Sequence, residues 1–421
     1  MTAKNAKQPD RLEVHYAPRF GERRHIGSLA LDRGTPVFEC SAEWIANPLP
    51  IAPLTFESRA GLIAGPGGMP DRLHGLFADS LPDAWGHVLA DRHFAGIGVA
   101  RERVTVLDRL AFIGTRAMGA LIYEPAGEPD LGAFTPDLDD LTDEAERVLS
   151  GTPTAILPQL IAAAGTSGGA RPKILVGLGR HDAMVTNADP LPDGYEPFLV
   201  KLGSSRDGPD AAAVEFAYSR MAAAAGLRVG ATRLLHGKKA RYFATLRFDR
   251  GPGGARTHVL TASGLTDIPH EYFAVEYGEL GGTIAKVCES YAEAGEFARR
   301  MAFNVLARNR DDHLKNTALL MDESGAWHVS PAYDLTLMPG PGGEHSMLVA
   351  GEGKSPTRVH LLDAAEAMGV ERAPMRGAID QVAAAVDRWE EFANEAELAA
   401  QRRKEIAAIL KQTRREVLGA R

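Results

Sequence analysis

Apolar and polar positions alternate over short runs in the first 125 residues, and this pattern predicts β-strands. The runs include LEVHYA, HIGSLALDRG, TPVFECSAEWI and AMGALIYEP, and glycine and proline separate them. After Pro82-Asp83 the apolar residues recur at helical spacing instead, so a helix is expected to begin there. We therefore predict an N-terminal part, residues 1–125, that combines strands with helices.

The run from Pro125 to Glu144 is acidic and rich in proline and glycine, which predicts a boundary between two parts of the chain. A helical pattern follows over about 143–163. Beyond it we expect strands in ILVGL and EPFLVKL, and a helix over about 211–227. TRLLH and ARYFATLRF flank the polar turn GKK and predict a hairpin. These elements make up a second part, residues 126–255.

The third part, residues 256–421, is expected to be mostly helical from about residue 290 onward, with one further hairpin. The last 25 residues include QRRKEIAAILKQTRRE, which predicts a basic helix of low hydrophobicity. Such a charge run favours a solvated amphipathic surface over a site for nucleic-acid phosphates.

Composition narrows the classes of function. The 421 residues carry 55 acidic and 47 basic side chains, a net charge of −8, which argues against nucleic-acid binding along the whole chain. The two cysteines, Cys40 and Cys288, lie far apart and lack metal-type spacing, so neither a disulfide framework nor a zinc site is expected. The chain also shows no apolar signal sequence and no run of eighteen apolar residues. A cytoplasmic protein without a membrane segment is expected.

The most specific polar segment is NRDDHLKN, residues 309–316, which ends a helical stretch and precedes a hairpin that leads to Asp334. Transfer of a phosphoryl group to a hydroxyl needs an acid near the acceptor, with an asparagine and a second acid on Mg²⁺. Asp311, Asn316 and Asp334 meet that requirement. An isolated Asp-x4-Asn pair usually marks only a turn, but its place between an apolar helix and a hairpin ending in aspartate favours catalysis.

Upstream segments supply groups suited to a nucleotide. The loop Gly165–Lys173 is rich in glycine, which suits backbone N–H groups that cover phosphates, although it lacks the GxxxxGK[ST] spacing. Lys201 lies in an apolar strand and needs an anionic partner, for which Glu215 on the next helix is the candidate. A purely structural salt bridge is the alternative. The segment 247–250 falls where a kinase chain crosses between lobes, so its backbone would meet adenine and Asp249 the ribose.

Together these motifs resemble the HipA-like toxin kinases, bacterial Ser/Thr kinases of type II toxin–antitoxin systems. The similar segments are FADSLPDAWG at 77–86, the glycines Gly114 and Gly119, GGARPK at 168–173 and DDHLKN at 311–316. The resemblance implies an α+β, two-lobed protein-kinase-like fold, related to phosphatidylinositol kinases. It adds an N-terminal α/β subdomain and a mostly helical C-terminal lobe.

The resemblance also implies residue roles, with ATP and Mg²⁺ as cofactors. Asp311 would be the catalytic aspartate, Asn316 and Asp334 the Mg²⁺ ligands, and Lys201 the lysine on the ATP phosphates. The remaining nucleotide-binding candidates are Gly168, Gly169, Ala170, Arg171, Lys173, Glu215, Arg247, Phe248, Asp249 and His313. Thr166 and Ser167 occupy the place of the family's autophosphorylated serine, and Leu246 stands where the family has an acid at the adenine hinge.

For partners, the resemblance implies a HipB-like helix-turn-helix antitoxin, operator DNA reached mainly through that antitoxin, and an aminoacyl-tRNA synthetase as substrate. The negative net charge fits a chain whose partner supplies the DNA contacts. Two alternatives remain open, a small-molecule or lipid kinase of the same fold and a pseudokinase that only binds. The pseudokinase is disfavoured because Lys201, Asp311, Asn316 and Asp334 are all present, and the N-terminal part favours a protein acceptor.

Overall fold

The computed structural model describes residues 8–127, 131–165, 169, 171–204, 208–272 and 274–419. The first of its sheets is antiparallel, with strand order β4-β3-β2-β1-β5. Its strands are β1 (Arg11–Arg19), β2 (Glu22–Asp32), β3 (Thr35–Cys40), β4 (Leu62–Ala64) and β5 (Leu121–Glu124). Its helices are α1 (Ala42–Ala46), α2 (Gly75–Ala78), α3 (Ala84–Gly96) and α4 (Val106–Ile113). Strands are confirmed in each predicted N-terminal run, and so is the helix that follows Pro82-Asp83. The run TPVFECSAEWI is strand only as far as Cys40, because the side chain of Ser41 caps helix α1 and ends the extended conformation.

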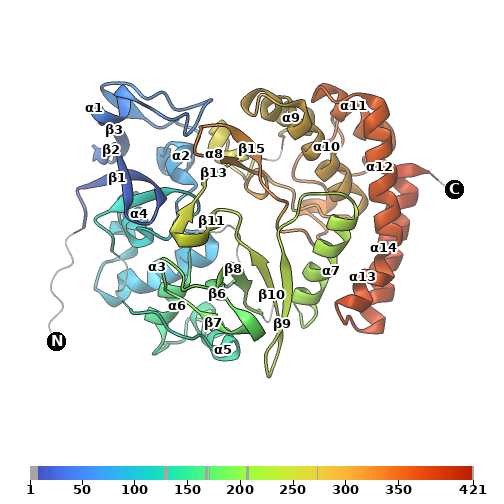
Figure 1. The fold of residues 1–421 in the computed structure, drawn as a ribbon, viewed down its shortest axis with the longest axis horizontal. Helices are drawn as coiled ribbons and strands as arrows, with labels where there is room; N and C mark the ends of the chain where they lie inside the picture. The colour runs from blue at the N-terminus through green and yellow to red at the C-terminus, as the bar shows by residue number, and fades with distance from the viewer. Residues whose placement is uncertain are drawn as a thin grey trace.

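The second sheet has strand order β7-β6-β8-β10-β9 and lies at the centre of Figure 1. Its strands are β6 (Lys173–Leu178), β7 (Met184–Val185), β8 (Glu196–Lys201), β9 (Thr232–His236) and β10 (Arg241–Leu246). β10 and β9 form the predicted hairpin, and helix α7 (Ala211–Ala224) packs against both strands. Three successive residues of β8, Phe198, Leu199 and Val200, are buried, while the side chain of Lys201 is 14% exposed.

The prediction of one helical stretch over 143–163 is wrong. The structure has α5 (Leu138–Leu149) and α6 (Leu157–Ala163), separated by an irregular segment. Gly151 in that segment has φ of +84°, a conformation that other residues adopt rarely, and Pro153 follows it. Helix α5 also begins inside the acidic run that was interpreted as a boundary, because the side chain of Asp137 caps its first turn.

The C-terminal part combines a small sheet, in the upper centre of Figure 1, with a layer of helices on its right. Its strands are β13 (His258–Thr261), β14 (Ala318–Met321) and β15 (Trp327–Val329), after the short pair β11 (Arg250–Gly251) and β12 (Ala255–Arg256). Its helices are α8 (Ala262–Thr266), α9 (Tyr277–Val287), α10 (Tyr291–Leu306), α11 (Arg358–Ala367), α12 (Arg372–Asp387), α13 (Trp389–Glu395) and α14 (Ala400–Leu418). The hairpin β14–β15 and the C-terminal helix are confirmed, whereas β13, which pairs with β14, was not predicted.

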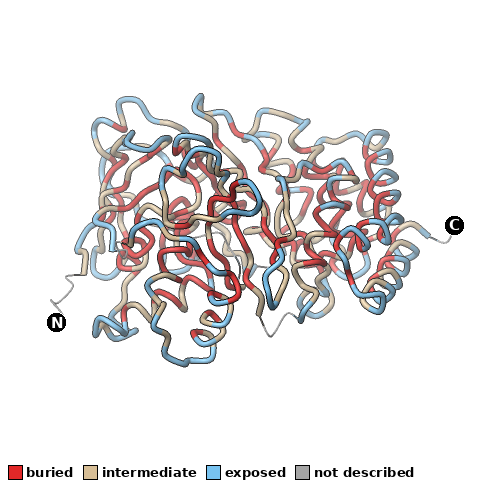
Figure 2. Tube along the Cα trace, turned by 60° about the horizontal axis from the view of Figure 1, so that its bottom comes forward, coloured by how far each residue is buried: buried red, intermediate tan, exposed pale blue. Residues whose placement is uncertain are grey.

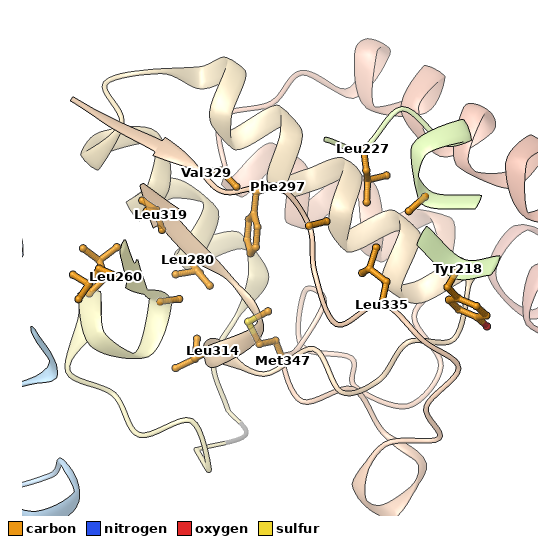
Figure 3. Close-up of a cluster of buried hydrophobic side chains, with 14 of the residues drawn as sticks. Tyr218, Leu227, Leu260, Leu280, Phe297, Leu314, Leu319, Val329, Leu335 and Met347 are labelled. Carbon is orange, nitrogen blue, oxygen red and sulfur yellow. The ribbon is translucent and has the colours of Figure 1, made fainter. Parts of the chain in front are cut away.

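One apolar core runs through the three larger sheets, and Figure 2 shows buried chain continuing from the N-terminal part into the C-terminal helices. Figure 3 shows a section of this core with Phe297 of α10 at its centre. Leu314 and Leu335 belong to the same cluster, and they are 1% and 5% exposed. Each of these leucines adjoins a predicted catalytic segment, so the core fixes both segments in place. Within the described part of the chain, no helix combines the length and the apolar character that crossing a membrane requires.

Candidate active site

The predicted catalytic segment follows helix α10, which ends at Leu306. The segment closes in a single 3-10 turn, Leu314–Asn316, before strand β14 begins. The side-chain amide of Asn316 donates to the backbone carbonyl of Asp311 (2.6 Å), which closes the segment into a compact loop. The hydroxyl of Tyr333 donates to the carbonyl of Lys315 (2.6 Å). The neighbours of Asn316 and Asp334 are therefore hydrogen-bonded to each other, and the two predicted Mg²⁺-binding segments lie side by side.

Asp312, the neighbour of Asp311, anchors this loop to the interior of the protein. It is 2% exposed, and its carboxylate accepts from the hydroxyl of Tyr277 (2.8 Å), Nδ1 of His345 (2.8 Å) and the backbone N–H of Ser346 (2.7 Å). Burial and the Asp312 carboxylate raise the pKa of Tyr277. The sequence analysis missed this network, although the doubled aspartate at 311–312 was a usable signal: one acid faces solvent and the other faces the core.

Lys201 forms ion pairs with both Glu215 and Asp334. The pair with Glu215 is the one predicted from the strand and helix pattern. The contact with Asp334 was not predicted, and it brings the loop after β15 against strand β8. Burial alone would lower the pKa of Lys201, but Asp334 and Glu215 raise it well above its usual value. Burial would likewise raise the pKa of Asp334, but Lys201 and Lys173 hold it below its usual value.

The backbone at Asp334 has φ of +53°, in the left-handed region that non-glycine residues adopt rarely. Asp334 is flanked by Tyr333, whose ring lies 5.7 Å from that of Phe248, and by the buried Leu335. Aspartate tolerates the left-handed conformation better than most residues, and such strain is typical of functional positions. The surrounding contacts thus hold the carboxylate of Asp334 toward Lys201 at some conformational cost.

A cavity with about 840 Å³ of empty space, including its open mouth, adjoins the ion pairs. The predicted residues in its wall are Lys173, Lys201, Glu215, Arg247, Phe248, Asp249 and Asp334. Residues that the sequence analysis did not assign to a nucleotide pocket complete the wall, among them Met118, Leu199, Val229, Tyr333 and Leu335. Leu246 also lines it and offers an apolar side chain in place of an acid. The mixture of an apolar wall with lysines at one end suits the polarity of a nucleotide.

Several predicted residues lie outside this wall. Asp311 and Asn316 are on the adjacent loop, where the side chain of Asp311 is 43% exposed. Nε2 of His313 lies 3.7 Å from Oδ1 of Asp311, and the His313 ring packs edge-on against His270. The side chain of His313 therefore contacts Asp311 and His270, and it does not line the cavity. Burial, with Lys315 nearby, lowers the pKa of His270 to about 4.

The glycine-rich loop is only partly described. The carbonyl of Gly169 accepts from Nζ of Lys173 (3.3 Å), and Arg171 is near enough to Glu215 to act on the pKa of that carboxyl group. Burial is the larger influence on Glu215 and raises its pKa. Thr166, Ser167, Gly168 and Ala170, all predicted in this loop, lie outside the described residues.

Asp249, predicted to reach ribose, is 2% exposed and accepts four hydrogen bonds. The donors are Nε and Nη2 of Arg247 (2.9 and 2.8 Å), Nη1 of Arg250 (2.8 Å) and the backbone N–H of Gly119 (2.8 Å). Burial would raise the pKa of Asp249, but the two arginines hold it well below its usual value. Asp249 thus ties the crossing between the lobes to the N-terminal part, and ribose binding stays a prediction.

Comparison with known proteins decides the family. The HipA-like C-terminal domain matches residues 165–416, and the HipA N-terminal domain matches residues 20–124. The chain belongs to the HipA family. The resemblance inferred from the motifs is confirmed. The N-terminal match covers most of the sheet within residues 11–124, and the C-terminal match contains the sheets within residues 173–329.

A solved structure shares the fold of this HipA-family chain. HipA in the "Shewanella oneidensis MR-1 Toxin Antitoxin System HipA, HipB and its operator DNA complex" superposes with a TM-score of 0.69 at 18% identity, covering 96% of this chain and 95% of that one. The predicted fold class is confirmed. The Helicobacter pylori proinflammatory kinase CtkA is more distant, with a TM-score of 0.39 at 13% identity over 58% of this chain and 90% of its own.

A curated relative matches over a shorter stretch. The putative kinase Y4dM of Sinorhizobium fredii (strain NBRC 101917 / NGR234) is 36% identical over 103 residues, which is 24% of either protein. The aligned stretch therefore spans about a quarter of that relative.

The donors present fit a magnesium ion. Among the described residues, no group of three or more His, Cys, Asp or Glu side chains is arranged to hold a metal. Magnesium in kinases needs fewer protein ligands, because it binds through one or two carboxylates together with substrate phosphates. The hard oxygen donors of Asp334 and Asn316 lie on hydrogen-bonded neighbouring segments and suit that mode.

The Asp249 cluster gives a stability prediction. Replacing Asp249 with Asn leaves Arg247 and Arg250 without their buried counter-charge, so we expect the free energy of unfolding to fall by about 3 kcal/mol. Because the folded-state pKa of Asp249 lies below its usual value, its stabilisation is present above pH about 4 and is lost as the pH falls further. Asp249→Asn should therefore lose less stability than the wild type between pH 5 and pH 3.

Urea unfolding at each pH, without nucleotide, measures both effects. Asp380→Asn, in an exposed pair with Arg358, is the matched control and should change stability by less than about 0.5 kcal/mol. An Asp249→Asn protein as stable as this control would contradict the structural role assigned to Asp249.

Proposed function

We propose that this HipA-family chain is an ATP-dependent protein Ser/Thr kinase that acts as the toxin of a HipBA-like toxin–antitoxin system. The observation that carries the proposal is the contact of Lys201 with both Glu215 and Asp334, in the wall of a cavity suited to a nucleotide. Protein kinases use a strand lysine, a helix glutamate and a metal-binding aspartate in this way. Asp311, on the adjoining loop, supplies the acid near the acceptor.

Different residues of the cavity and the adjoining loop would bind the adenine, the phosphates and the Mg²⁺ ion. Leu199, Val229, Leu246 and Phe248 form the apolar wall that would hold adenine. Lys173 and Lys201 would bind the phosphates, and Asn316 with Asp334 would hold Mg²⁺, which neutralises charge on the transferred group when bound. The contacts of Asp312 and Leu314 keep the catalytic loop in position.

In the proposed reaction the oxygen of an acceptor hydroxyl forms a bond to the γ-phosphorus of ATP. The bond between that phosphorus and the oxygen that bridges the β- and γ-phosphates breaks. Asp311 accepts the proton of the hydroxyl at its carboxylate, and ADP leaves with the electron pair of the broken bond. The 43% exposure of the Asp311 side chain leaves room for a substrate side chain to approach it.

The partners are proposed from a related solved complex, from the net charge and from the resemblance to the toxin kinases. The likeness to a HipA described in a complex with HipB and operator DNA supports a small helix-turn-helix antitoxin as partner. The net charge of −8 supports DNA contacts made mainly by that antitoxin. The resemblance to the toxin kinases supports a cytoplasmic aminoacyl-tRNA synthetase as substrate.

Catalysis by Asp311 predicts that Asp311→Asn phosphorylates protein substrates roughly 10²–10⁴-fold more slowly than the wild type, because the general base is lost. The folded state should be unaffected, since the carboxylate is partly exposed. Transfer of labelled phosphate from γ-labelled ATP measures the rate, with Asp380→Asn as control. Labelling by Asp311→Asn at near the wild-type rate would refute the assignment.

The toxin proposal predicts that expression without an antitoxin arrests translation and growth, and that the Asp311→Asn protein does neither. Incorporation of a labelled amino acid after induction measures translation, and phosphoproteomics of the same cells identifies the substrate. Unchanged translation in cells that contain active kinase would overturn the toxin role and leave the kinase intact.

Thr166 or Ser167 is proposed as a site of autophosphorylation that silences the kinase, because a phosphate there would compete with ATP for the same cations. Mass spectrometry of freshly purified protein after incubation with Mg-ATP should find one modified hydroxyl in the peptide that spans 165–171. Finding only the unmodified peptide in an active preparation would contradict this.

A further inference from the structure

A short segment of the N-terminal part, residues 75–86, lies between the second part of the chain, residues 126–255, here called the ATP lobe, and the third part, residues 256–421, here called the catalytic lobe. Toward the catalytic lobe, the backbone N–H of Gly75 donates to Asp267 (2.6 Å), and Asp79 accepts from the backbone N–H and hydroxyl of Thr261 (2.6 and 2.8 Å). Toward the ATP lobe, Asp83 accepts from Nζ of Lys173 (2.9 Å). One segment outside both kinase sheets thus bonds to each of them.

Asp83 uses its two carboxylate oxygens for different purposes. Oδ1 accepts from the backbone N–H of Gly86 (2.6 Å) and caps helix α3, while Oδ2 pairs with Lys173. The side chains of Lys173 and Asp83 are only 4% and 5% exposed. A lysine ammonium so deeply buried is costly without an anionic partner, so Asp83 decides where that ammonium sits.

The position of Lys173 matters to the cavity. It lines the wall and pairs in register with Lys201 across strands β6 and β8. It is also close enough to Asp334 to help hold the pKa of that carboxyl group below its usual value. Lys173 therefore brings a second positive charge to the end of the cavity where Lys201 and Asp334 meet.

We infer that Asp83 is a positioning residue for the nucleotide phosphates, acting through the ammonium of Lys173. The N-terminal part then completes the ATP site, in addition to any role in docking. This inference rests on the proposed function, because it takes the phosphates of ATP as the ligand of Lys173.

The variant Asp83→Asn separates the two roles of Asp83. Asparagine caps helices as well as aspartate does, so its Oδ1 keeps the bond to Gly86. Its Nδ2 then faces Lys173 as a second donor, which removes the counter-charge and displaces the ammonium. We expect the Kd of the full-length protein for Mg-ATP, measured by calorimetry, to rise at least tenfold. The thermal midpoint without nucleotide reports separately on folding.

Asp91→Asn is the matched control, because Asp91 lies on helix α3, which Asp83 caps, but forms its ion pair with Arg109 (2.8 Å). The side chain of Asp91 is 26% exposed. Its Kd should equal that of the wild type. In a Lys173→Met background, Asp83→Asn should produce no further loss, since Asp83 acts only through Lys173. Should Asp83→Asn fold poorly, Asp83→Ser keeps a capping oxygen without the charge and should show the same loss of affinity.

Wild-type affinity in a well-folded Asp83→Asn protein would overturn the inference and leave the proposed function standing. The same tenfold loss in the Lys173→Met background would overturn it as well, because Asp83 would then act by another route. If the wild type itself fails to bind Mg-ATP, the proposed function fails and the inference falls with it.

Discussion

A lysine ammonium with little access to water must have anionic partners, and the site is arranged around that requirement. Lys201 has two partners, Glu215 from helix α7 and Asp334 from the loop after β15. A strand and a helix of the ATP lobe are thereby bonded to a loop of the catalytic lobe. Removing one partner of such a buried pair commonly costs several kcal/mol, so the three elements keep their mutual positions.

The same requirement recurs at two further places where separate parts of the chain meet. Lys173 pairs with Asp83 of the N-terminal part, and Asp249 pairs with Arg247 and Arg250 while it accepts from the backbone of Gly119. At Lys173 a buried charge is paired with a charge from another part of the chain. At Asp249 the charges pair within residues 247–250, and the N-terminal part adds the backbone N–H of Gly119. The N-terminal part is therefore joined to the rest of the chain by the buried ion pair of Lys173, by hydrogen bonds and by the continuous apolar core.

The catalytic loop is held by a different kind of contact. Leu314 and Leu335 insert into the apolar core on either side of the site, and Asp312 accepts three hydrogen bonds beneath the loop. These contacts leave the carboxylate of Asp311 as the partly exposed acid of the segment. A rigid support of this kind would position the proposed catalytic group, Asp311, without burying it.

The sequence predicted what depends on nearby residues. Alternation of apolar and polar residues predicted the strands, and helical spacing predicted α3 and α7. The apolar strand around Lys201 predicted an anionic partner, which is Glu215, fourteen residues away. The break between α5 and α6 is an exception, because the prediction missed it although Gly151 and Pro153 mark it locally.

The other features that the sequence did not predict depend on residues far apart in the chain. The partner of Lys173 lies ninety residues upstream, and the partners of Asp312 come from segments near 277 and 345. Strand β13 is four residues long and is recognised only through its pairing with β14. Periodicity along the chain carries no information about such pairs, because it describes one element at a time.

The central claim is that Asp334, held against Lys201, forms part of a site for Mg-ATP. Calorimetric titration of the full-length protein with ATP, with and without Mg²⁺, compared between the wild type and Asp334→Asn, tests it most directly. The account predicts that Mg²⁺ strengthens ATP binding to the wild type and that most of this gain is lost in Asp334→Asn. An equal gain from Mg²⁺ in both proteins would contradict it.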